Sequence, residues 1–159
     1  MRRLRVTLII ATLDPAGTEK QVSLLARRLD AERFDASVVA LTRGGPYADE
    51  LRRAGIRVDV LGKAFKYDLR VVGRLRRLLQ ERRIDVAYTW MFTANAFGRM
   101  AALWAHTPVV LAAEMDTGAK PSLHHRIDRF LARRTDAVVA NSLGVREYGL
   151  QHGLSLIHI

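Results

Sequence analysis

Three residues at the start of an expected helix have the types that bind phosphate or sugar groups. Gly17, Thr18 and Glu19 follow a short turn that contains Asp14 and Pro15, and an apolar periodic segment comes after them. Backbone N–H groups at a helix N-terminus favour a phosphate, and a glycine there lets a ligand approach the backbone closely. We therefore interpret Gly17 as a residue beside a phosphate or an acceptor group, with a plain turn glycine as the alternative.

Thr18 and Glu19 have competing interpretations. Thr18 and Gln21 match the Thr-x-x-Gln pattern of a capping box, which favours a helix cap over a ligand contact for Thr18. Glu19 lies within reach of a ligand in the same loop, although acidic side chains in the first turn of a helix are commonly solvated. Both remain candidate substrate-binding residues.

A second group of candidates follows the fourth apolar segment of the chain. Trp90 could stack on a sugar ring while Asn95 hydrogen-bonds to it, and Arg99 lies one turn further on, where it could meet an anionic group. The alternative is that Trp90 packs the loop, Asn95 caps the following helix and Arg99 lies at the surface. We predict a loop over residues 90–95 that contributes to a substrate site.

Two carboxylates follow the fifth apolar segment. Glu114 and Asp116 stand where an acceptor hydroxyl would arrive, and a carboxylate there could orient or deprotonate that hydroxyl. They are the candidate catalytic residues. The alternative is a solvated or arginine-paired carboxylate.

Other kinds of site find little support. Cysteine is absent, and the adjacent His124 and His125 point about 100° apart on a helix, so a metal site is not expected. His106 precedes a strand, at the wrong end for a ligand, and is expected at the surface. Ser142 lacks a G-x-S-x-G context and is interpreted as a helix N-cap. The sequence holds no G-x-G-x-x-G, so a dinucleotide site and a cofactor are not expected.

The candidates are positioned by short apolar strands that alternate with amphipathic helices. The expected strands are residues 4–11, 37–42, 56–61, 85–89, 108–113 and 136–140. The clearest helices are residues 69–83, 93–105, which is rich in alanine, and 122–134, with Leu123, Ile127, Phe130 and Leu131 facing inward. This pattern predicts an α/β fold, a Rossmann-like parallel sheet of about six strands with helices on both faces. Ligands of such folds bind at the carboxyl ends of the strands.

Composition fits one globular domain with an excess of positive charge. The chain has 159 residues, 26 Lys and Arg against 16 Asp and Glu, and a formal net charge of +10. Arg70, Arg74 and Arg77 lie on the helix over residues 69–83 and could attract an anionic membrane surface, although a plain solvated face is the alternative. A nucleic-acid partner is not expected, because no recognised binding motif is present and aromatic residues do not alternate with the basic ones. The apolar runs are too short for a membrane span or a signal peptide.

Three segments together resemble the N-terminal domain of family 4 glycosyltransferases. LDPAGTEKQ (residues 13–21) resembles the GG-x-E loop after the first strand of that family. DVAYTWMFTAN (residues 85–95) resembles its fourth strand with the following loop, and DAVVANS (residues 136–142) resembles the strand near the end of its N-terminal domain. The resemblance covers roughly residues 4–153 and rests on the order and spacing of the segments.

The resemblance implies a GT-B fold and sugar transfer. Enzymes of this family have two Rossmann-like domains that face each other across a cleft, and they move a sugar, typically a hexose, from a nucleotide-sugar donor to an acceptor with retention of configuration. The acceptor would be a glycan or a lipid-linked molecule, as in polysaccharide biosynthesis. Commonly no metal is needed, and the sequence has no Asp-x-Asp. A cytoplasmic protein, with peripheral binding at the inner face of the membrane, would fit.

The sequence also departs from the family pattern. The C-terminal domain that carries most donor contacts is not in these 159 residues, so the chain is expected to be inactive alone. Ala16 replaces the first glycine of the loop, and Glu114, Met115 and Asp116 stand where the family often has a histidine.

The last residues allow two interpretations. LSLIHI (residues 154–159) resembles a translated sequencing adapter, which would limit the native domain to residues 1–153, and a natural apolar tail that forms another strand is the alternative.

A self-contained flavodoxin-like domain that binds a phosphate ligand remains the alternative function, because the length suits a single domain of that type.

Overall fold

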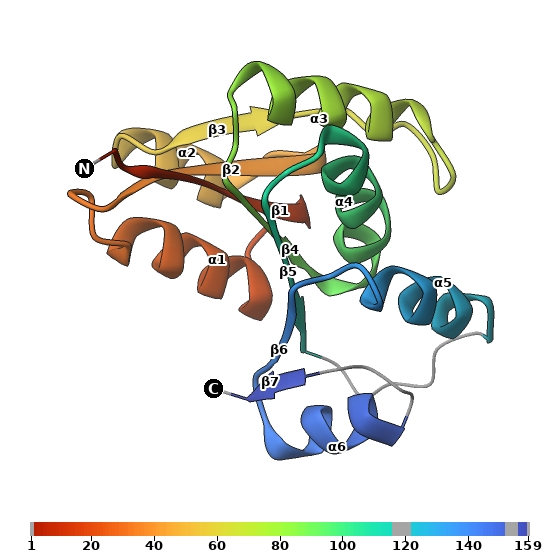
Figure 1. Ribbon diagram of the computed structural model, residues 1–159. Helices are drawn as coiled ribbons and strands as arrows, with labels where there is room; N and C mark the ends of the chain where they lie inside the picture. Colours follow the sequence, from red (N-terminus) through yellow and green to blue (C-terminus); the bar gives the residue numbers. More distant parts are fainter. Residues whose placement is uncertain (1, 116–121, 152–155, 159) are drawn as a thin grey trace.

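The protein folds as a single parallel sheet flanked by helices (Figure 1). The computed structural model describes residues 2–115, 122–151 and 156–158. The strands are β1 Leu4–Thr12, β2 Phe34–Arg43, β3 Arg57–Val60, β4 Val86–Trp90, β5 Val109–Glu114, β6 Ala137–Ala140 and β7 Leu156–His158. The helices are α1 Gly17–Arg28, α2 Pro46–Arg53, α3 Arg70–Glu81, α4 Met91–Ala105, α5 Ser122–Ala132 and α6 Leu143–Gln151.

The strand order is β3-β2-β1-β4-β5-β6-β7, and all pairings are parallel. From β1 the chain adds β2 and β3 toward one edge of the sheet, and from β4 onward it adds strands toward the opposite edge. The strand order therefore reverses between the neighbouring strands β1 and β4. That junction is the topological switch point, where open α/β sheets bind their ligands outside the carboxyl ends of the strands. The α/β, Rossmann-like fold expected from the sequence is confirmed.

The sheet has one strand more than the six expected. Strand β7 continues the sheet beyond β6, with Val139 opposite Ile157. Residues 156–158 therefore pair as an additional strand. Whether the native domain ends at residue 153 stays a prediction.

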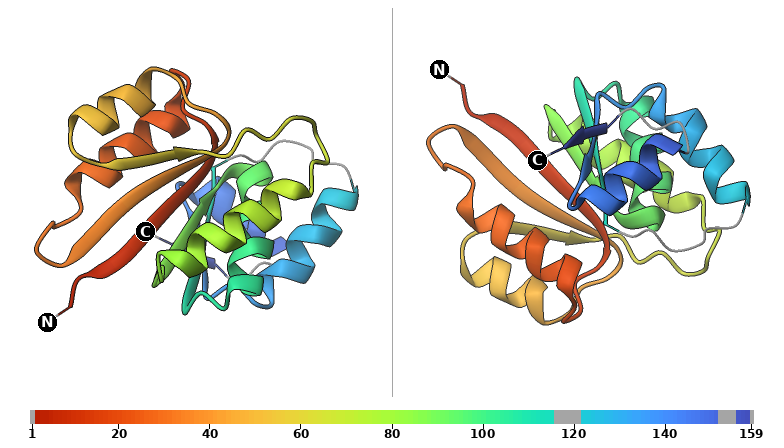
Figure 2. Two further views of the ribbon diagram at one scale, coloured as in Figure 1. Left: turned by 90° about the horizontal axis from the view of Figure 1, so that it is seen from above. Right: turned by 90° about the horizontal axis from the view of Figure 1, so that it is seen from below.

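Figure 2 shows α1 and α2 on one face of the sheet and α3 and α4 on the other, and two apolar layers hold them there. On one face, Leu8, Ile10 and Val38 pack with Val22 of α1 and Leu51 of α2. On the other face, the side chains that alternate with these in β1 and β2, together with β4, pack against α3 and α4. That second layer includes Ile9, Val39, Leu75, Leu79 and Ala101. Because β1 and β2 contribute to both layers, their sequences are apolar at almost every position.

Helix α4 lies unusually close to the sheet at Gly98. A Cβ atom on this glycine would come within 2.7 Å of Thr89 Cγ2 and 3.3 Å of Ile9 Cγ2. The alanines Ala94, Ala101 and Ala102 are completely buried along the same helix. The close packing expected from the alanine-rich sequence is confirmed, and it depends on the absence of a side chain at residue 98.

Candidate functional site

The candidate site is the edge of the sheet at the switch point, where α1 begins. Ala16 is the N-cap residue of α1 and has an extended backbone, and no side chain caps the helix. The first N–H groups of α1 therefore have no side-chain acceptor within the described part of the chain. A helix N-terminus of this kind is a donor site for an anion, which the positive end of the helix dipole also favours.

Gly17 is the first residue of this helix, and the fold does not demand a glycine there. It is exposed, and a Cβ atom placed on it would have no neighbour within 4 Å. It is also not among the residues with positive φ. A strained turn therefore does not explain this glycine. Its role beside a phosphate or an acceptor stays a prediction.

The capping box predicted for Thr18 is wrong. Thr18 lies inside α1, at its second residue, because Ala16 is the N-cap. The Thr18 hydroxyl instead contacts the sulfur of Met115 at 3.9 Å, just beyond the end of β5. This contact joins the loop after β1 to the segment after β5, so two of the predicted regions do meet at the switch point.

Glu19 is half-buried beneath this loop. Its Oε1 accepts a long hydrogen bond of 3.5 Å from the Thr12 hydroxyl at the end of β1. This contact turns the carboxylate toward the sheet. A solvated first-turn acid, the alternative expectation, does not describe this position.

The loop after β2 supports the loop after β1. Leu13 N–H donates to the Gly44 carbonyl at 3.0 Å, and Tyr47 N–H donates to the Leu13 carbonyl at 3.2 Å. Gly45 has a φ of 123°, and a Cβ atom there would lie 2.6 Å from the Leu13 carbonyl oxygen, so no other residue type fits. Arg43 pairs with Asp14 across the two loops. Gly45 thus has an architectural reason in this loop.

Strand β4 passes directly into α4, so the loop predicted over residues 90–95 does not exist. Met91, the first residue of α4, has a φ of 66°, a left-handed conformation that is uncommon for a residue with a side chain. This single residue makes the sharp turn at the carboxyl end of β4. Backbone strain of this type concentrates at functional sites, which makes the junction part of the candidate site.

Trp90 is a buried core residue at this junction. Its ring centroid lies 4.8 Å from that of Tyr88, and it packs in the layer that holds α1. Burial raises the pKa of Tyr88 to about 12, so the phenol stays protonated at neutral pH. The indole Nε1 is buried and has no hydrogen-bond acceptor among the described residues. Packing, the alternative expectation for Trp90, is what this geometry supports.

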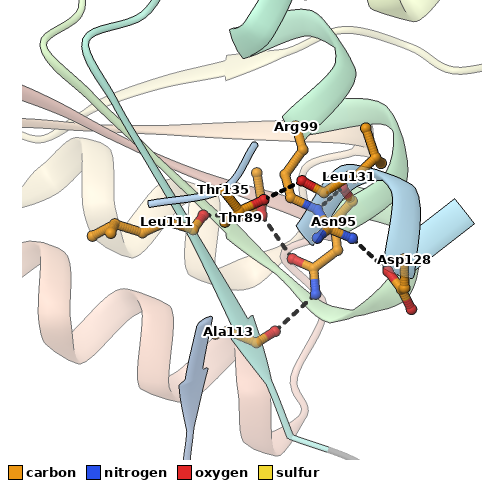
Figure 3. A network of polar contacts seen from close by, with 8 residues as sticks. All are labelled: Thr89, Asn95, Arg99, Leu111, Ala113, Asp128, Leu131 and Thr135. Carbon is orange, nitrogen blue, oxygen red and sulfur yellow. Dashed lines mark hydrogen bonds and ion pairs between the residues drawn. The ribbon is translucent and has the colours of Figure 1, made fainter. Parts of the chain in front are cut away.

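Asn95 and Arg99 belong to a buried polar network rather than to an open surface (Figure 3). The Asn95 side chain accepts a hydrogen bond from the Thr89 hydroxyl at 2.7 Å and donates to the Ala113 carbonyl at 3.0 Å. Its amide thus joins α4 to β4 and β5, and it does not cap the helix. The amide oxygen and nitrogen are therefore both engaged inside the protein.

The Arg99 guanidinium is only 2% exposed. Its Nε donates to the Asn95 carbonyl at 2.7 Å, and its terminal nitrogen pairs with the buried Asp128 of α5. Burial lowers the pKa of Arg99, while the charges of Asp128 and Glu114 act in the opposite direction. The surface position that was the alternative expectation for Arg99 is wrong. The geometry supports a buried ion pair that links α4 to α5, and not an anion site.

Of the two candidate catalytic carboxylates, Glu114 lies within the described residues and Asp116 does not. Glu114 ends β5 at the carboxyl edge of the sheet, opposite Ala140, but it is only 3% exposed. Its charge raises the pKa of the buried Arg99. The role of Glu114 toward an acceptor stays a prediction. Asp116 lies outside the described residues, and its role stays a prediction.

Sequence reasoning missed Asp128 and misplaced Phe130. Asp128 precedes Leu131 by one turn, and both are buried, so the inward face of α5 includes a carboxylate. An acidic residue on an otherwise apolar face was the available signal. Phe130 was expected inward but is exposed. Ser142 caps α6 as predicted, since its hydroxyl accepts from Val145 N–H at 3.3 Å.

Two negative findings apply to the described ranges only. Among residues 2–115 and 122–151, no group of three or more His, Cys, Asp or Glu side chains has the arrangement of a metal site. No helix in the described part of the chain has both the length and the hydropathy needed to cross a membrane.

Solved structures share this fold over nearly the whole chain. Anabaena Alr3699/HepE, crystallised with UDP and glucose, matches with a TM-score of 0.83 and 20% identity, over 99% of this chain and 44% of that one. A glycosyltransferase from Rickettsia africae matches with a TM-score of 0.80 and 14% identity, over 99% and 43% of the two chains. A putative UDP-N-acetylglucosamine 2-epimerase from Listeria monocytogenes matches with a TM-score of 0.69 and 15% identity, over 98% and 43%.

These likenesses establish the fold, and the chain spans less than half the length of the solved proteins. No curated protein sequence matches the chain. A family model does match: the glycosyl transferase 4-like domain, over residues 16–158. That match begins at the N-cap residue of α1, reaches the end of β7 and covers most of the sequence. The chain therefore belongs to the family of glycosyl transferase 4-like domains.

Proposed function

We propose that the chain is the acceptor-side half of a glycosyltransferase that moves a sugar from a nucleotide-sugar donor to an acceptor. The observation that carries the proposal is the N-terminus of α1, without a side-chain cap, at the switch point of a domain of this family. An anionic or hydroxyl-rich group would bind the first N–H groups of α1 beside Gly17. The solved structure of Alr3699/HepE with UDP and glucose supports a nucleotide sugar as the donor class.

The finer features of the reaction follow the family resemblance. We propose a retaining hexosyl transfer that needs no metal or other cofactor and that serves polysaccharide biosynthesis. The donor would be held mainly by a second domain, and the acceptor, a glycan or a lipid-linked molecule, by this one. Asp116 and Glu114 are the carboxylates that would orient or deprotonate an acceptor hydroxyl, and the Glu114 side chain is buried at the end of β5. A cytoplasmic location belongs to the same proposal.

We also propose that the domain associates with an anionic membrane surface at the cytoplasmic face. Arg70 and Arg77 are exposed on α3 and have no ion-pair partner in the described part of the chain. Arg74 pairs with Asp68 at 3.1 Å, so its positive charge is partly neutralised within the protein. It therefore attracts lipid phosphates less than Arg70 and Arg77 do. Each free arginine near such a surface contributes about 1 kcal/mol of attraction.

A transfer assay tests the central proposal. The protein encoded by the full reading frame is incubated with a panel of nucleotide sugars and glycan or lipid-linked acceptors, in parallel with the 159-residue chain. We expect turnover with the former only, because the phosphates of the leaving nucleotide must be stabilised by groups that this domain does not provide. Turnover by the 159-residue chain at ordinary enzyme rates contradicts the proposed division of labour.

The flavodoxin-like alternative rests on the same helix N-terminus, which suits any phosphate ligand. It requires that the reading frame stop near residue 153 or 159, whereas the transferase proposal requires a second βα domain after this one. Sequencing the gene beyond the codon for Ile159 distinguishes them.

A further inference from the structure

A polar cavity lies at the amino edge of the sheet, the edge opposite to the switch-point site. Its volume is about 460 Å³, which is within the usual range of small-molecule pockets. It opens where strands β1, β2 and β3 begin and where α3 ends. Its polar side chains come from these three strands and from the end of α3: Arg5, Asp35, Ser37, Arg57, Glu81 and Arg82. The proposed sugar transfer uses none of them.

The strand register brings four of these side chains to one face of the sheet. Arg5 lies opposite Asp35, Thr7 lies opposite Ser37, and Ser37 in turn lies opposite Arg57. Residues that are opposite each other in a sheet point to the same face, and so do residues that are two apart on a strand. The side chains of Arg5, Asp35, Ser37 and Arg57 therefore converge over three adjacent strands, on the face that α3 covers.

A buried hydroxyl group forms part of the cavity floor. Ser37 is only 8% exposed, and its hydroxyl oxygen lies 2.8 Å from that of the buried Thr7 and 3.3 Å from the Val6 carbonyl. With Thr7 donating to Ser37 and Ser37 donating to Val6, the Ser37 oxygen keeps a lone pair for a further donor. The neighbouring central residues of both strands are apolar, so the core itself does not require a hydroxyl here.

The wall formed by the end of α3 is held in place. Two N–H groups of Arg82 donate to the Asp59 carboxylate, one of them at 2.7 Å. The Arg82 carbonyl accepts from Arg5 Nη1 at 3.1 Å. Both arginines are thus fixed relative to the sheet. A wall that is already ordered reduces the entropy lost when a ligand binds.

Other charged groups of the cavity form no hydrogen bond or ion pair within the described part of the chain. This holds for the exposed side chains of Arg57, Asp35 and Glu81. Arg5 lies opposite Asp35 in the sheet, yet its guanidinium turns to the Arg82 carbonyl instead. The cavity therefore holds donors and acceptors that do not neutralise each other and that are available to a ligand.

This mixture of groups suits a ligand that carries both an anion and hydroxyl groups. The guanidinium groups of Arg5 and Arg57 match a phosphate, and the carboxylates of Asp35 and Glu81 accept hydrogen bonds from hydroxyls. A bare phosphate suits the cavity less well, because α2 and α3 both end at this edge and direct the negative ends of their dipoles toward it.

We propose that the cavity binds a small phosphorylated polyol, such as a hexose phosphate. The phosphate would lie between Arg5 and Arg57, and the hydroxyls would face Asp35, Ser37 and Glu81. This site is separate from the N-terminus of α1, and the inference does not rest on sugar transfer.

Amide chemical shifts in NMR spectra of the 159-residue chain locate the ligand. The chain is titrated in parallel with glucose-6-phosphate, with glucose and with inorganic phosphate. We expect saturable shifts at residues 35–37 and 55–57 with glucose-6-phosphate. Glucose and inorganic phosphate should each bind at least about tenfold more weakly, because each supplies only part of the contacts.

A matched pair of arginine variants tests the phosphate contact by isothermal titration calorimetry. Arg57→Gln should weaken the binding of glucose-6-phosphate about tenfold, since it removes a charge-assisted hydrogen bond. Arg28→Gln is the control, because Arg28 is exposed on α1, forms no ion pair with a described residue and does not line the cavity. The control should bind like the unmodified chain.

A matched pair of acidic variants tests the hydroxyl contact. Asp35→Asn should weaken glucose-6-phosphate several-fold but should not weaken inorganic phosphate, because the change removes a negative charge. Glu32→Gln removes the same charge at an exposed position outside the cavity and should leave the binding of glucose-6-phosphate unchanged. Circular dichroism verifies that all variants keep the fold.

Four results would overturn the inference. The first is the absence of saturable shifts with glucose-6-phosphate, and the second is shifts at residues 17–20 in place of the cavity, which would assign the phosphate to the N-terminus of α1. The third is an equal loss from Arg57→Gln and Arg28→Gln. The fourth is inorganic phosphate binding as tightly as glucose-6-phosphate, which would exclude a role for the hydroxyls. Sugar transfer is measured separately, so none of these results decides the transferase proposal.

Discussion

The N-terminus of α1 and the junction of α4 with α5 present opposite uses of polar groups. At α1 the first N–H groups have no side-chain cap, and Gly17 has open space around it. At α4 the polar atoms of Asn95 and Arg99 bond to the protein itself, and Asp128 completes the network in the interior (Figure 3). Both regions were candidate ligand sites in the sequence, but of the two only the first leaves donors available within the described part of the chain.

The difference teaches that a polar residue after a strand is ambiguous until its long-range partners are known. Asn95 and Arg99 join α4 to α5 and to two strands of the sheet. Gly17 instead leaves the helix N-terminus accessible, because it has no side chain. Buried polar groups of this kind are costly unless every one is satisfied, so they specify an arrangement rather than a ligand. Mutations in the two regions should therefore have different signatures: loss of stability at α4, loss of activity at α1.

The largest expected effect is on stability, from Arg99→Met. This change removes the cation and leaves the Asp128 carboxylate buried without its arginine, which should lower the free energy of unfolding by about 3–5 kcal/mol. Urea unfolding followed by circular dichroism measures it. Arg77→Met is the control, since Arg77 is exposed on α3, and its cost should stay within about 0.5 kcal/mol. Equal costs for the two variants would contradict the structural role of the network.

Gly98→Ala should be the next largest change. The new methyl group would meet Thr89 Cγ2 at 2.7 Å, and a buried β-branched side chain cannot move aside easily. Overpacking of this kind costs about 1–3 kcal/mol. Gly73→Ala on α3 is a matched control with open space around it, and it should stabilise the protein by about 0.5–1 kcal/mol because alanine favours helix. Opposite signs in thermal unfolding are the expected result.

Much of the fold could be predicted from local patterns. Strand β1 was placed to within one residue because its run of apolar, β-branched residues is buried on both faces. The end of β4 could not be predicted in this way. A loop was expected over residues 90–95, but the left-handed backbone of Met91 joins strand and helix without one, and no residue type in the sequence signals that conformation.

The candidate site was predictable only in part. The place of Gly17 follows from the order strand, turn, helix, which is a local pattern. The buried guanidinium of Arg99 pairs with Asp128, which is 29 residues away in the sequence. Such contacts between distant residues are decided by how α4 and α5 pack, and hydrophobic periodicity does not encode them. The role of each residue toward a substrate stays a prediction.

Gly17→Val tests the N-terminus of α1, the region that is expected to bind a ligand. In the protein encoded by the full reading frame, the branched side chain would obstruct a group approaching the α1 N-terminus. We expect a loss of transfer of at least about tenfold, which corresponds to about 1.4 kcal/mol in the barrier. The fold should persist, because a Cβ atom there meets nothing within 4 Å. Gly17→Ala, with its smaller side chain, should retain most of the activity, and unchanged kinetics for the valine variant would make Gly17 a plain turn residue.

Removing residues 154–159 should have a smaller effect. Strand β7 has three residues and pairs only with β6 in the described part of the chain, so its hydrogen bonds roughly offset the entropy of ordering it. We expect the midpoint of thermal unfolding to change by less than about 2 °C. A loss of several degrees would show instead that β7 is an integral strand of the domain.

The smallest expected effect comes from Thr18→Ala. This variant distinguishes the helix cap that the sequence pattern predicts from the position of Thr18 inside α1. If Thr18 capped α1, its loss would cost about 1 kcal/mol. Because Ala16 is the N-cap and the Thr18 hydroxyl only contacts the Met115 sulfur at 3.9 Å, we expect a change within about 0.5 kcal/mol. Ser142→Ala is the matched comparison, since the Ser142 hydroxyl does accept from Val145 N–H at 3.3 Å, and it should cost about 1 kcal/mol. If urea unfolding gave the larger loss for Thr18→Ala, the first N–H groups of α1 would already have an acceptor in the protein, and the anion site proposed there would lose its donors.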